Sequence, residues 1–139
     1  MLHRTSRYPL KCYKVMIEER GNKNRVCPYY FKDYGYIDVG SEMKPKQKET
    51  IEYLDEQDTL DCGIIHSYGN YKEAKDMFKL FCSLTLSKKI VIVECEIPAF
   101  TPYWKGACQE YASTRLITKQ VIDRYVPDEI TFNITFKDF

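Results

Sequence analysis

Apolar and polar residues alternate along several segments with the period of two that is typical of β-strands. Residues 10–18 show this pattern in a β-branched and aromatic background, and residues 20–24 contain the glycine and asparagines of a hairpin turn. Residues 26–31 can return as the paired strand, although Pro28 restricts that strand to an edge or a bulge. Residues 34–40 predict a further short strand or a structured loop bounded by glycines.

A second group of strands is predicted in the C-terminal half. The run Ile90 to Val93 is too apolar to have one face in water, so we expect residues 89–97 to form a central strand that is covered on both faces. The pattern then alternates, which places Glu94 and Glu96 on one face before Pro98 ends the strand. Residues 113–124 and 129–136 predict two more strands.

Two helices are predicted between these strands. In residues 70–84 the apolar side chains recur at three-and-four spacing and charged residues fill the other face; Asn70 is placed to cap this helix, with Glu73 three positions later. Residues 45–57 are rich in lysine, glutamate and glutamine and predict a more exposed helix that begins near Pro45, or a flexible insertion.

These elements predict an α+β fold. We expect a mixed, mostly antiparallel sheet of about five to six strands, with the long amphipathic helix (residues 70–84) packed on it and the second helix (45–57) more exposed. The 139 residues fit one domain, and we expect residues 1–139 to form it.

Charge and hydropathy exclude several classes of function. The 21 basic and 20 acidic residues nearly cancel, so the sequence has no strong nucleic-acid signal. No run approaches the ~20 apolar residues of a membrane span, and the first residues lack the apolar region of a signal peptide. We therefore expect a cytoplasmic protein without a membrane partner.

The six cysteines are widely spaced and form no Cys-x-x-Cys pair, and the chain has only two histidines. This spacing does not favour a zinc site, so we predict no metal and no cofactor. The cysteines are expected to be reduced thiols that pack mostly as small apolar side chains.

Twelve tyrosines and seven phenylalanines are the main compositional feature. Tyrosine can line a small β-rich core, or it can form an adhesive surface for another protein. The rings between positions 29 and 36 cannot all face inward from one strand, which indicates a secondary aromatic surface. That surface comprises Tyr29, Tyr30, Tyr34 and Tyr36.

His66 precedes the predicted start of the long helix. The unpaired amides of a helix N-terminus bind anions, so His66, Ser67, Tyr68 and Asn70 are candidates for a nucleotide-binding cradle. The alternative is that Ser67 and Asn70 only cap the helix and that His66 bonds a neighbouring carbonyl.

Two other groups of residues are candidates for chemistry or binding. Glu94 and Glu96, roughly 6.5 to 7 Å apart on one strand face, could work as an acid–base pair or simply face solvent. A loop braced by Pro98 and Pro102 could present aromatic side chains at its tip, or it could fold over the sheet edge and bury its indole. The binding candidates from this loop onward are Tyr103, Trp104, Lys105, Glu110 and Tyr111.

Catalytic motifs are not evident. The sequence contains no Gly-x-Ser-x-Gly elbow, no phosphate-binding loop and no Gly-x-Gly-x-x-Gly run. We therefore assign no catalytic residue, and the sequence favours a binding protein over an enzyme.

The chain contains the motifs Gly63-Ile64-Ile65-His66-Ser67-Tyr68, Ile-Pro, Thr-x-Tyr-x-x-Gly and Glu-Tyr-Ala-Ser, in that order and with the predicted long helix after the first. In these motifs it resembles small uncharacterised proteins carried by bacteriophages and gut bacteria. The resemblance spans about residues 11–122. It implies an accessory protein of a phage or mobile element, which acts in the bacterial host cytoplasm by binding a host or defence factor through an aromatic surface.

A fainter resemblance is to the ADP-ribosyltransferase-like fold. It implies a nicotinamide-side role for Ser67 and a catalytic carboxylate at Glu110 or Glu96. The first strand departs from that family, because it offers only Lys14 or Tyr13 where an arginine or histidine would hold NAD. This departure argues against transferase activity. The alternative hypothesis is therefore a nucleotide-binding or ADP-ribosyltransferase-like protein with a pocket at His66 to Tyr68.

Overall fold

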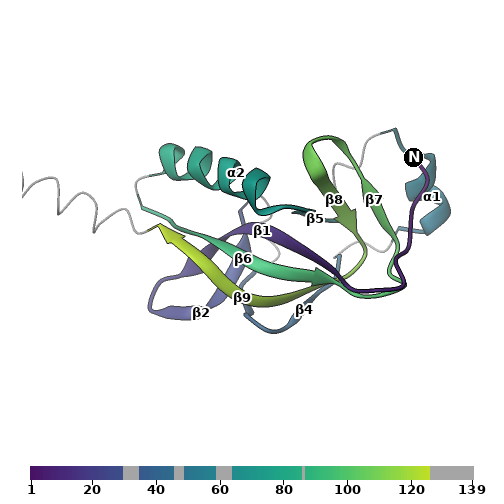
Figure 1. Cartoon of the computed structure of the whole chain (residues 1–139). Helices are drawn as coiled ribbons and strands as arrows, with labels where there is room; N and C mark the ends of the chain where they lie inside the picture. The colour runs from purple at the N-terminus through teal and green to yellow at the C-terminus, as the bar shows by residue number, and fades with distance from the viewer. Residues whose placement is uncertain (30–34, 46–48, 59–63, 86, 126–139) are drawn as a thin grey trace, which may run out of the picture.

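The structure is a computed structural model that describes residues 1–29, 35–45, 49–58, 64–85 and 87–125. Its main feature is one nine-stranded sheet with the order β4-β9-β6-β1-β5-β8-β7, to which β2 and β3 are attached through β1 (Figure 1). The strands are β1 (Leu10–Glu19), β2 (Asn22–Pro28), β3 (Ile37–Asp38), β4 (Glu42–Met43), β5 (Ile65–Tyr68), β6 (Lys89–Ile97), β7 (Tyr103–Lys105), β8 (Glu110–Ser113) and β9 (Leu116–Tyr125). The helices are α1 (Ile51–Glu56) and α2 (Tyr71–Leu84), and a 3₁₀ turn, η2, spans Ala107–Gln109.

The predicted α+β class is confirmed, but strands dominate the fold more than the sequence indicated. Among the described residues the sheet has nine strands where about five to six were expected. Every strand pairing found there is antiparallel. The additional strands are short: β4 contains two residues and β7 contains three. Segments of this length carry no readable alternation.

The sheet forks at β1. One edge of β1 pairs with β6 along nearly its whole length, from the Leu10–Ile97 pair to the Glu18–Lys89 pair. The other edge is shared, because its first half pairs with β5 at Tyr13 and its second half pairs with β2 from Met16 onward. Between these two positions β5 and β2 diverge, and the fork brings β5 and β8 beside the first half of β1.

Each face of the central strands has its own core. On one face, α2 packs on the sheet; this core contains Val15, Ile17, Cys27, Ala74, Phe78, Phe81, Ile90 and Ile92. The opposite face curls around a second core, formed by Cys12, Met16, Val26, Met43, Ile65, Val91, Val93, Cys95, Ile97 and Leu116. The four residues from Ile90 to Val93 are fully buried, which confirms the prediction of a central strand covered on both faces.

The second helix is shorter than predicted. It begins at Ile51, with Thr50 as its cap: the Thr50 side chain accepts a hydrogen bond from the Tyr53 amide at 3.1 Å. Lys44 and Pro45 are not helical, so the predicted start near Pro45 is wrong. The thin apolar stripe explains the short length, because Leu54 is the only residue of α1 that is buried, in a third cluster with Ile64, Trp104 and Ala112.

Other boundaries also differ from the predictions. The expected strand at 113–124 is two strands, β8 and β9, separated by Thr114 and Arg115. The expected strand at 129–136 lies outside the described residues.

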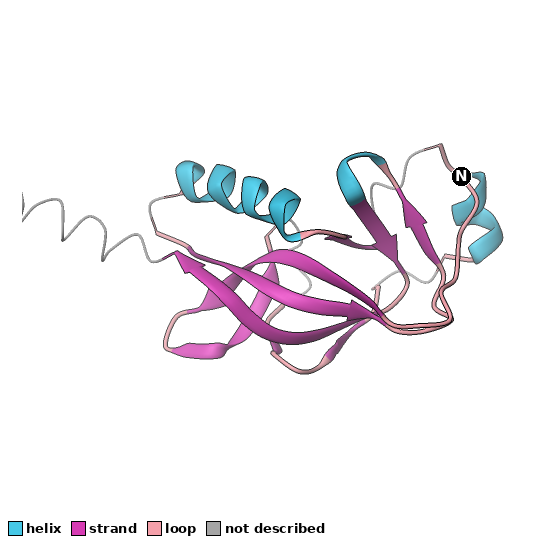
Figure 2. Cartoon of the chain, viewed as in Figure 1, coloured by secondary structure: helices cyan, strands magenta, loops and turns pink. Residues whose placement is uncertain are grey.

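Figure 2 shows α2 and α1 near opposite ends of the sheet. No helix in the described part of the chain is long and apolar enough to cross a membrane.

Candidate functional site

Strand β5 places three of the four residues of the predicted nucleotide cradle, His66, Ser67 and Tyr68, alternately on its two faces. Tyr68 packs against the core under α2, whereas Ile65 belongs to the curled core on the opposite face. Because successive strand residues point to opposite faces, His66 lies on the Tyr68 side and Ser67 lies on the Ile65 side. These three residues therefore do not form one cradle.

On the α2 side of the sheet, five side chains from five adjacent strands lie in register. Tyr13 is paired with Glu94 on one side and with Tyr68 on the other. Tyr68 is paired with Glu110, and Glu94 with Gln120. Directly paired residues share a face and are spaced by about 4.8 Å per strand. We call Gln120, Glu94, Tyr13, Tyr68 and Glu110 the tyrosine–carboxylate row; all five are at least partly accessible to solvent.

Cations and amides hold the carboxylates of the row. His66 Nδ1 lies 3.2 Å from Glu110 Oε1. Glu94 accepts a hydrogen bond from Gln120 Nε2 at 2.6 Å and pairs with Lys11 Nζ at 2.9 Å, and these contacts lower the pKa of Glu94. Glu96 pairs separately with Lys119 at 3.5 Å. Glu94 and Glu96 therefore each pair with a separate lysine and not with each other.

The first turn of α2 adds a third tyrosine to this region. Asn70 caps the helix as predicted, and its Oδ1 accepts a hydrogen bond from the Glu73 amide at 2.9 Å. The ring of Tyr71 packs edge-on against Tyr13 with 5.8 Å between centroids, and its hydroxyl bonds Asp123. The helix terminus is thus fixed against the row.

A strained turn positions Glu110 at the end of the row. Cys108 and Gln109, which precede it, have φ angles of 56° and 58°, a conformation that side chains other than glycine rarely adopt. The Gln109 carbonyl accepts a hydrogen bond from the Gly69 amide at 2.7 Å. Gly69 is required there, because a Cβ would lie 2.8 Å from the Tyr111 ring. Non-glycine residues at positive φ often occur near functional sites.

The other face of β5 belongs to the interior. Ser67 is buried beside the Cys12 thiol. Burial raises the pKa of Cys12 to about 12, against the opposing effect of the Ser67 hydroxyl and the Lys14 ammonium. Tyr111, paired with Ser67, packs on the curled core and contacts Tyr103 edge-on at 5.5 Å. Ser67 and Tyr111 therefore serve the core and not an open pocket.

Lys14 is a buried lysine that the sequence analysis named only as a substitute NAD ligand. It lies at the fork of β1, where its Nζ donates a hydrogen bond to the His66 carbonyl at 2.5 Å. Burial lowers the pKa of Lys14 to about 8. A sequence signal for this burial existed, because Lys14 shares a strand face with Cys12 and Met16.

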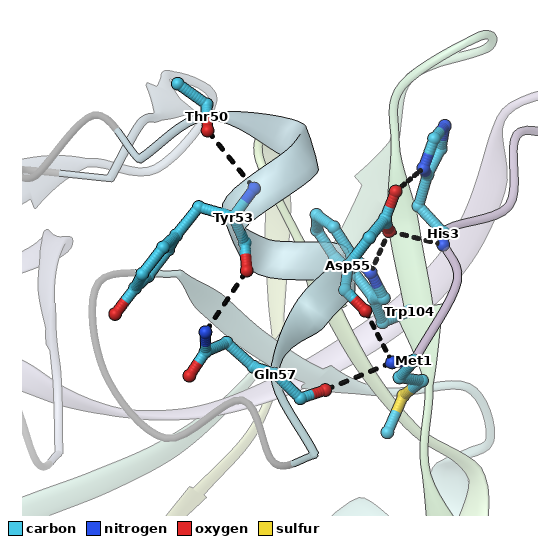
Figure 3. Close-up of polar contacts among 7 residues, drawn as sticks. All are labelled: Met1, His3, Thr50, Tyr53, Asp55, Gln57 and Trp104. Carbon is cyan, nitrogen blue, oxygen red and sulfur yellow. Dashed lines mark hydrogen bonds and ion pairs between the residues drawn. The ribbon is translucent and has the colours of Figure 1, made fainter.

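Trp104 does not stand at the tip of a loop. It lies in β7, is 1% exposed, and donates from Nε1 to Asp55 Oδ1 at 2.9 Å. Figure 3 shows that Asp55 also binds the backbone and ring nitrogens of His3, each at 2.8 Å. Burial alone would raise the pKa of Asp55, but the hydrogen bonds from His3 and Trp104 lower it. Of the two alternatives for this loop, burial of the indole is the one observed; Lys105 remains exposed.

The aromatic residue that the proline-braced loop exposes is Phe100. It is 70% exposed and has a φ of 60°. The Thr101 amide donates to the Pro98 carbonyl at 3.2 Å, so Phe100 is the third residue of a tight turn. This residue was not predicted as a site residue, because its sequence neighbourhood gives no sign of the positive φ.

The predicted secondary aromatic surface is only partly described. Tyr29 stacks on Phe81 of α2 with 4.0 Å between ring centroids, so its ring serves the core. Tyr36 is exposed, as predicted for a surface ring. Tyr30 and Tyr34 lie outside the described residues.

Within the described ranges no three His, Cys, Asp or Glu side chains gather in a way that could hold a metal ion, and the five cysteines found there are free thiols. Comparisons with protein-family models, with curated proteins and with solved structures found no match.

Proposed function

We propose that this chain is a binding protein that recognises a partner protein through the tyrosine–carboxylate row, extended by His66 and Tyr71. The observation that carries the proposal is the register of Tyr13, Tyr68 and Glu110 across adjacent strands, with each side chain partly accessible. In this proposal the protein is an accessory protein of a phage or mobile element, and its partner is a host or defence factor in the bacterial cytoplasm.

The chemistry of the row suits protein recognition. Tyrosine gives a large contact area at a small loss of conformational entropy, and it is enriched where proteins bind one another. The rings of the row are already ordered, since Tyr13 contacts Tyr71 at 5.8 Å and both row tyrosines pack against the α2 core. Little side-chain freedom is left to lose on binding, which favours affinity.

Electrostatics indicates how the surface would bind. Lys11 neutralises Glu94, and His66 lies beside Glu110 at 3.2 Å. A surface with paired charges exerts little long-range attraction, so association is expected at the ordinary rate of uncharged surfaces and with weak dependence on salt. Specificity would come from shape and from the hydrogen-bonding groups at the two ends of the row.

No observation favours a nucleotide pocket or a transferase site to the same degree. Ser67, the nicotinamide-side residue that the resemblance implied, is buried on the opposite side of β5 from Tyr68. The proposal therefore moves the expected binding surface away from Trp104 and Ser67, and it retains His66, Tyr68 and Glu110 from the predicted set.

Affinity capture with a quantitative follow-up tests the proposal. The tagged chain and a row variant that combines Tyr71→Ala with Glu110→Arg would be incubated with bacterial lysate. Proteins captured by the unmodified chain would be identified by mass spectrometry, purified, and titrated against both forms. We expect at least about tenfold weaker binding by the row variant, because it removes a ring and reverses a charge.

The matched control is Tyr53→Ala, which removes a half-exposed tyrosine from α1, away from the row. It should bind like the unmodified chain. The proposal is wrong if the row variant and the control bind every captured protein with the same affinity as the unmodified chain while all three remain folded by circular dichroism.

A further inference from the structure

Two aromatic side chains project into solvent at the end of the sheet opposite α2. Tyr8 is 76% exposed and Phe100 is 70% exposed, although rings of this size normally bury most of their surface. The tyrosine–carboxylate row does not include either residue. Their exposure therefore calls for a separate explanation.

The turn holds Phe100 in a backbone conformation that residues other than glycine disfavour. The turn closed by Thr101 and Pro98 has a positive φ of 60° at Phe100, a position that such turns normally give to glycine. A bulky side chain is strained there, and the exposed ring gains little packing in return. The surrounding fold nevertheless fixes the turn, because the Phe100 amide donates to the Ser6 carbonyl at 2.7 Å.

Ser6 also brings Tyr8 to the same place. Its hydroxyl accepts a hydrogen bond from the Tyr8 amide at 3.2 Å, so Ser6 bonds the backbones of both aromatic residues. Figure 2 shows the segment that precedes β1 and the loop between β6 and β7 running side by side at this end of the molecule. We call Tyr8 and Phe100, on these two segments, the aromatic tip.

The two segments that build the tip contain basic residues and no acidic ones. Arg4 and Arg7 precede Tyr8 in the chain, are exposed, and form no ion pair with a described residue. Residues 1–17 and 97–109 contain no aspartate or glutamate, although the whole chain has 20 acidic residues against 21 basic ones. The two segments that build the tip are thus a local basic region on a nearly neutral protein.

We propose that the aromatic tip binds the surface of an anionic lipid membrane. Aromatic rings of this kind favour the boundary between headgroups and acyl chains, and nearby arginines are attracted to anionic headgroups. The tip presents two rings on adjoining segments, which fits insertion into a soft interface. The protein would lie on the membrane reversibly and would not span it. We expected no membrane partner because the sequence has no spanning run, but surface binding needs no such run, and this contact is independent of the row.

Vesicle co-sedimentation tests the inference. The probes are vesicles of phosphatidylcholine and phosphatidylglycerol at a ratio of about 7:3, and vesicles of phosphatidylcholine alone, at low salt where anionic attraction is strong. We expect binding to the anionic vesicles, weaker binding to the neutral ones, and loss of most binding at high salt. Phe100→Gly should weaken the partition coefficient at least about fivefold without destabilising the turn, and Arg4→Gln with Arg7→Gln should remove the preference for anionic lipid.

Two further variants keep the test decisive. Tyr8→Ser removes the other ring and should also weaken binding, whereas Leu84→Ala removes an exposed apolar side chain from the far end of α2 and should have no effect. The inference is overturned if the unmodified chain stays in the supernatant, if it binds neutral and anionic vesicles equally, or if Phe100→Gly and Tyr8→Ser bind like Leu84→Ala. None of these outcomes bears on the row, which is tested by protein capture.

Discussion

Trp104 and Phe100 lie four positions apart, on either side of Pro102, but they differ sharply in solvent exposure. Trp104 is 1% exposed in a regular strand, whereas Phe100 is 70% exposed in a strained turn. By composition the sole tryptophan was the stronger candidate for a binding surface. The comparison shows that ring type did not decide which side chain is presented.

What lies opposite each residue explains the difference. Trp104 is paired with Ala112 of β8, whose small side chain leaves room for the indole, and Leu54 of α1 belongs to the same cluster. The indole N–H also has an acceptor, Asp55, 49 positions away in the sequence. Phe100 occupies a turn closed by its own neighbours and has no comparable partner. Burial thus follows from distant segments that provide both space and a hydrogen-bond acceptor.

The largest expected effect comes from removing the buried ring. Trp104→Ala should lower the free energy of unfolding by about 3 to 5 kcal/mol, because it leaves a cavity among Leu54, Ile64 and Ala112 and deprives Asp55 of a donor. Phe100→Ala should change it by less than about 0.5 kcal/mol, as expected for an exposed side chain. Urea unfolding measures both, and similar values for the two variants would contradict the comparison.

Lys14 extends the comparison to a buried charge. Its pKa is lowered from 10.5 to about 8, so between these pH values the unfolded chain binds the proton that the folded chain has lost. Stability from this group therefore rises as pH increases from about 8 to about 10, by at most about 3 kcal/mol.

The buried thiols act in the opposite direction at high pH, because the raised pKa of Cys12 means that the unfolded chain loses that proton first. The readout is therefore the difference in unfolding free energy between the unmodified chain and Lys14→Met, measured by urea unfolding from pH 7 to 10. This difference should shift in favour of the unmodified chain as pH rises. A constant difference would show that Lys14 is not desolvated.

The acceptor of the indole has a smaller effect, with the same sign of pH dependence as Lys14 but in the acidic range. The pKa of Asp55 is lowered from 3.8, so its contribution to stability is present above about pH 4 and is lost as pH falls through the folded-state pKa. Asp55→Asn should lower the urea midpoint at pH 7, by less than Trp104→Ala. The difference in urea midpoint between Asp55→Asn and the unmodified chain should be smaller at pH 3 than at pH 7. An equal difference at both pH values would contradict the role of the carboxylate.

The smallest expected effect tests the strain at the exposed ring. At a φ of 60°, Phe100→Gly should be more stable than Phe100→Ala by about 1 kcal/mol, because glycine adopts this conformation without a steric cost. Ala99→Gly is the matched control: its φ is not positive, so glycine there should lower stability by about 0.4 to 1 kcal/mol. Chemical denaturation of the three variants measures these differences, and equal stability of Phe100→Gly and Phe100→Ala would argue against strain.

Elements with long, regular patterns were predictable. The α2 helix has five apolar positions at helical spacing and an Asn70 cap, and β1 and β6 have nine or more residues of strand pattern. Short elements were less so: β4 and β7, with two and three residues, were not predicted, and the predicted second helix is α1 with only six residues. Such segments are held by their partners across the sheet, so their own residues carry little signal.

The candidate site was predictable in its parts but not in its grouping. His66 and Tyr68 were identified as parts of one cradle and Glu110 as a separate candidate, and pairing of β5 with β8 brings the three together. Ser67 and Tyr111 were identified in the same way, yet the period of two in a strand directs them to the interior. Tyr13 and Gln120 join the row only because β1 and β9 lie in register with its other members.

By itself, the sequence determined the local properties of this protein: which segments form the long strands and the α2 helix, where Asn70 caps, and which residues can bind through aromatic rings. Those properties depend on residues within one or two turns of each other. Only the tertiary structure decided that Trp104 is buried and Phe100 exposed, that Lys14 is buried at the fork of β1, and that five strands bring the tyrosine–carboxylate row into register. These outcomes depend on segments 26 to 55 or more positions apart in the chain, such as the pairing of Tyr13 with Tyr68 and of Glu94 with Gln120, whose register no local pattern encodes.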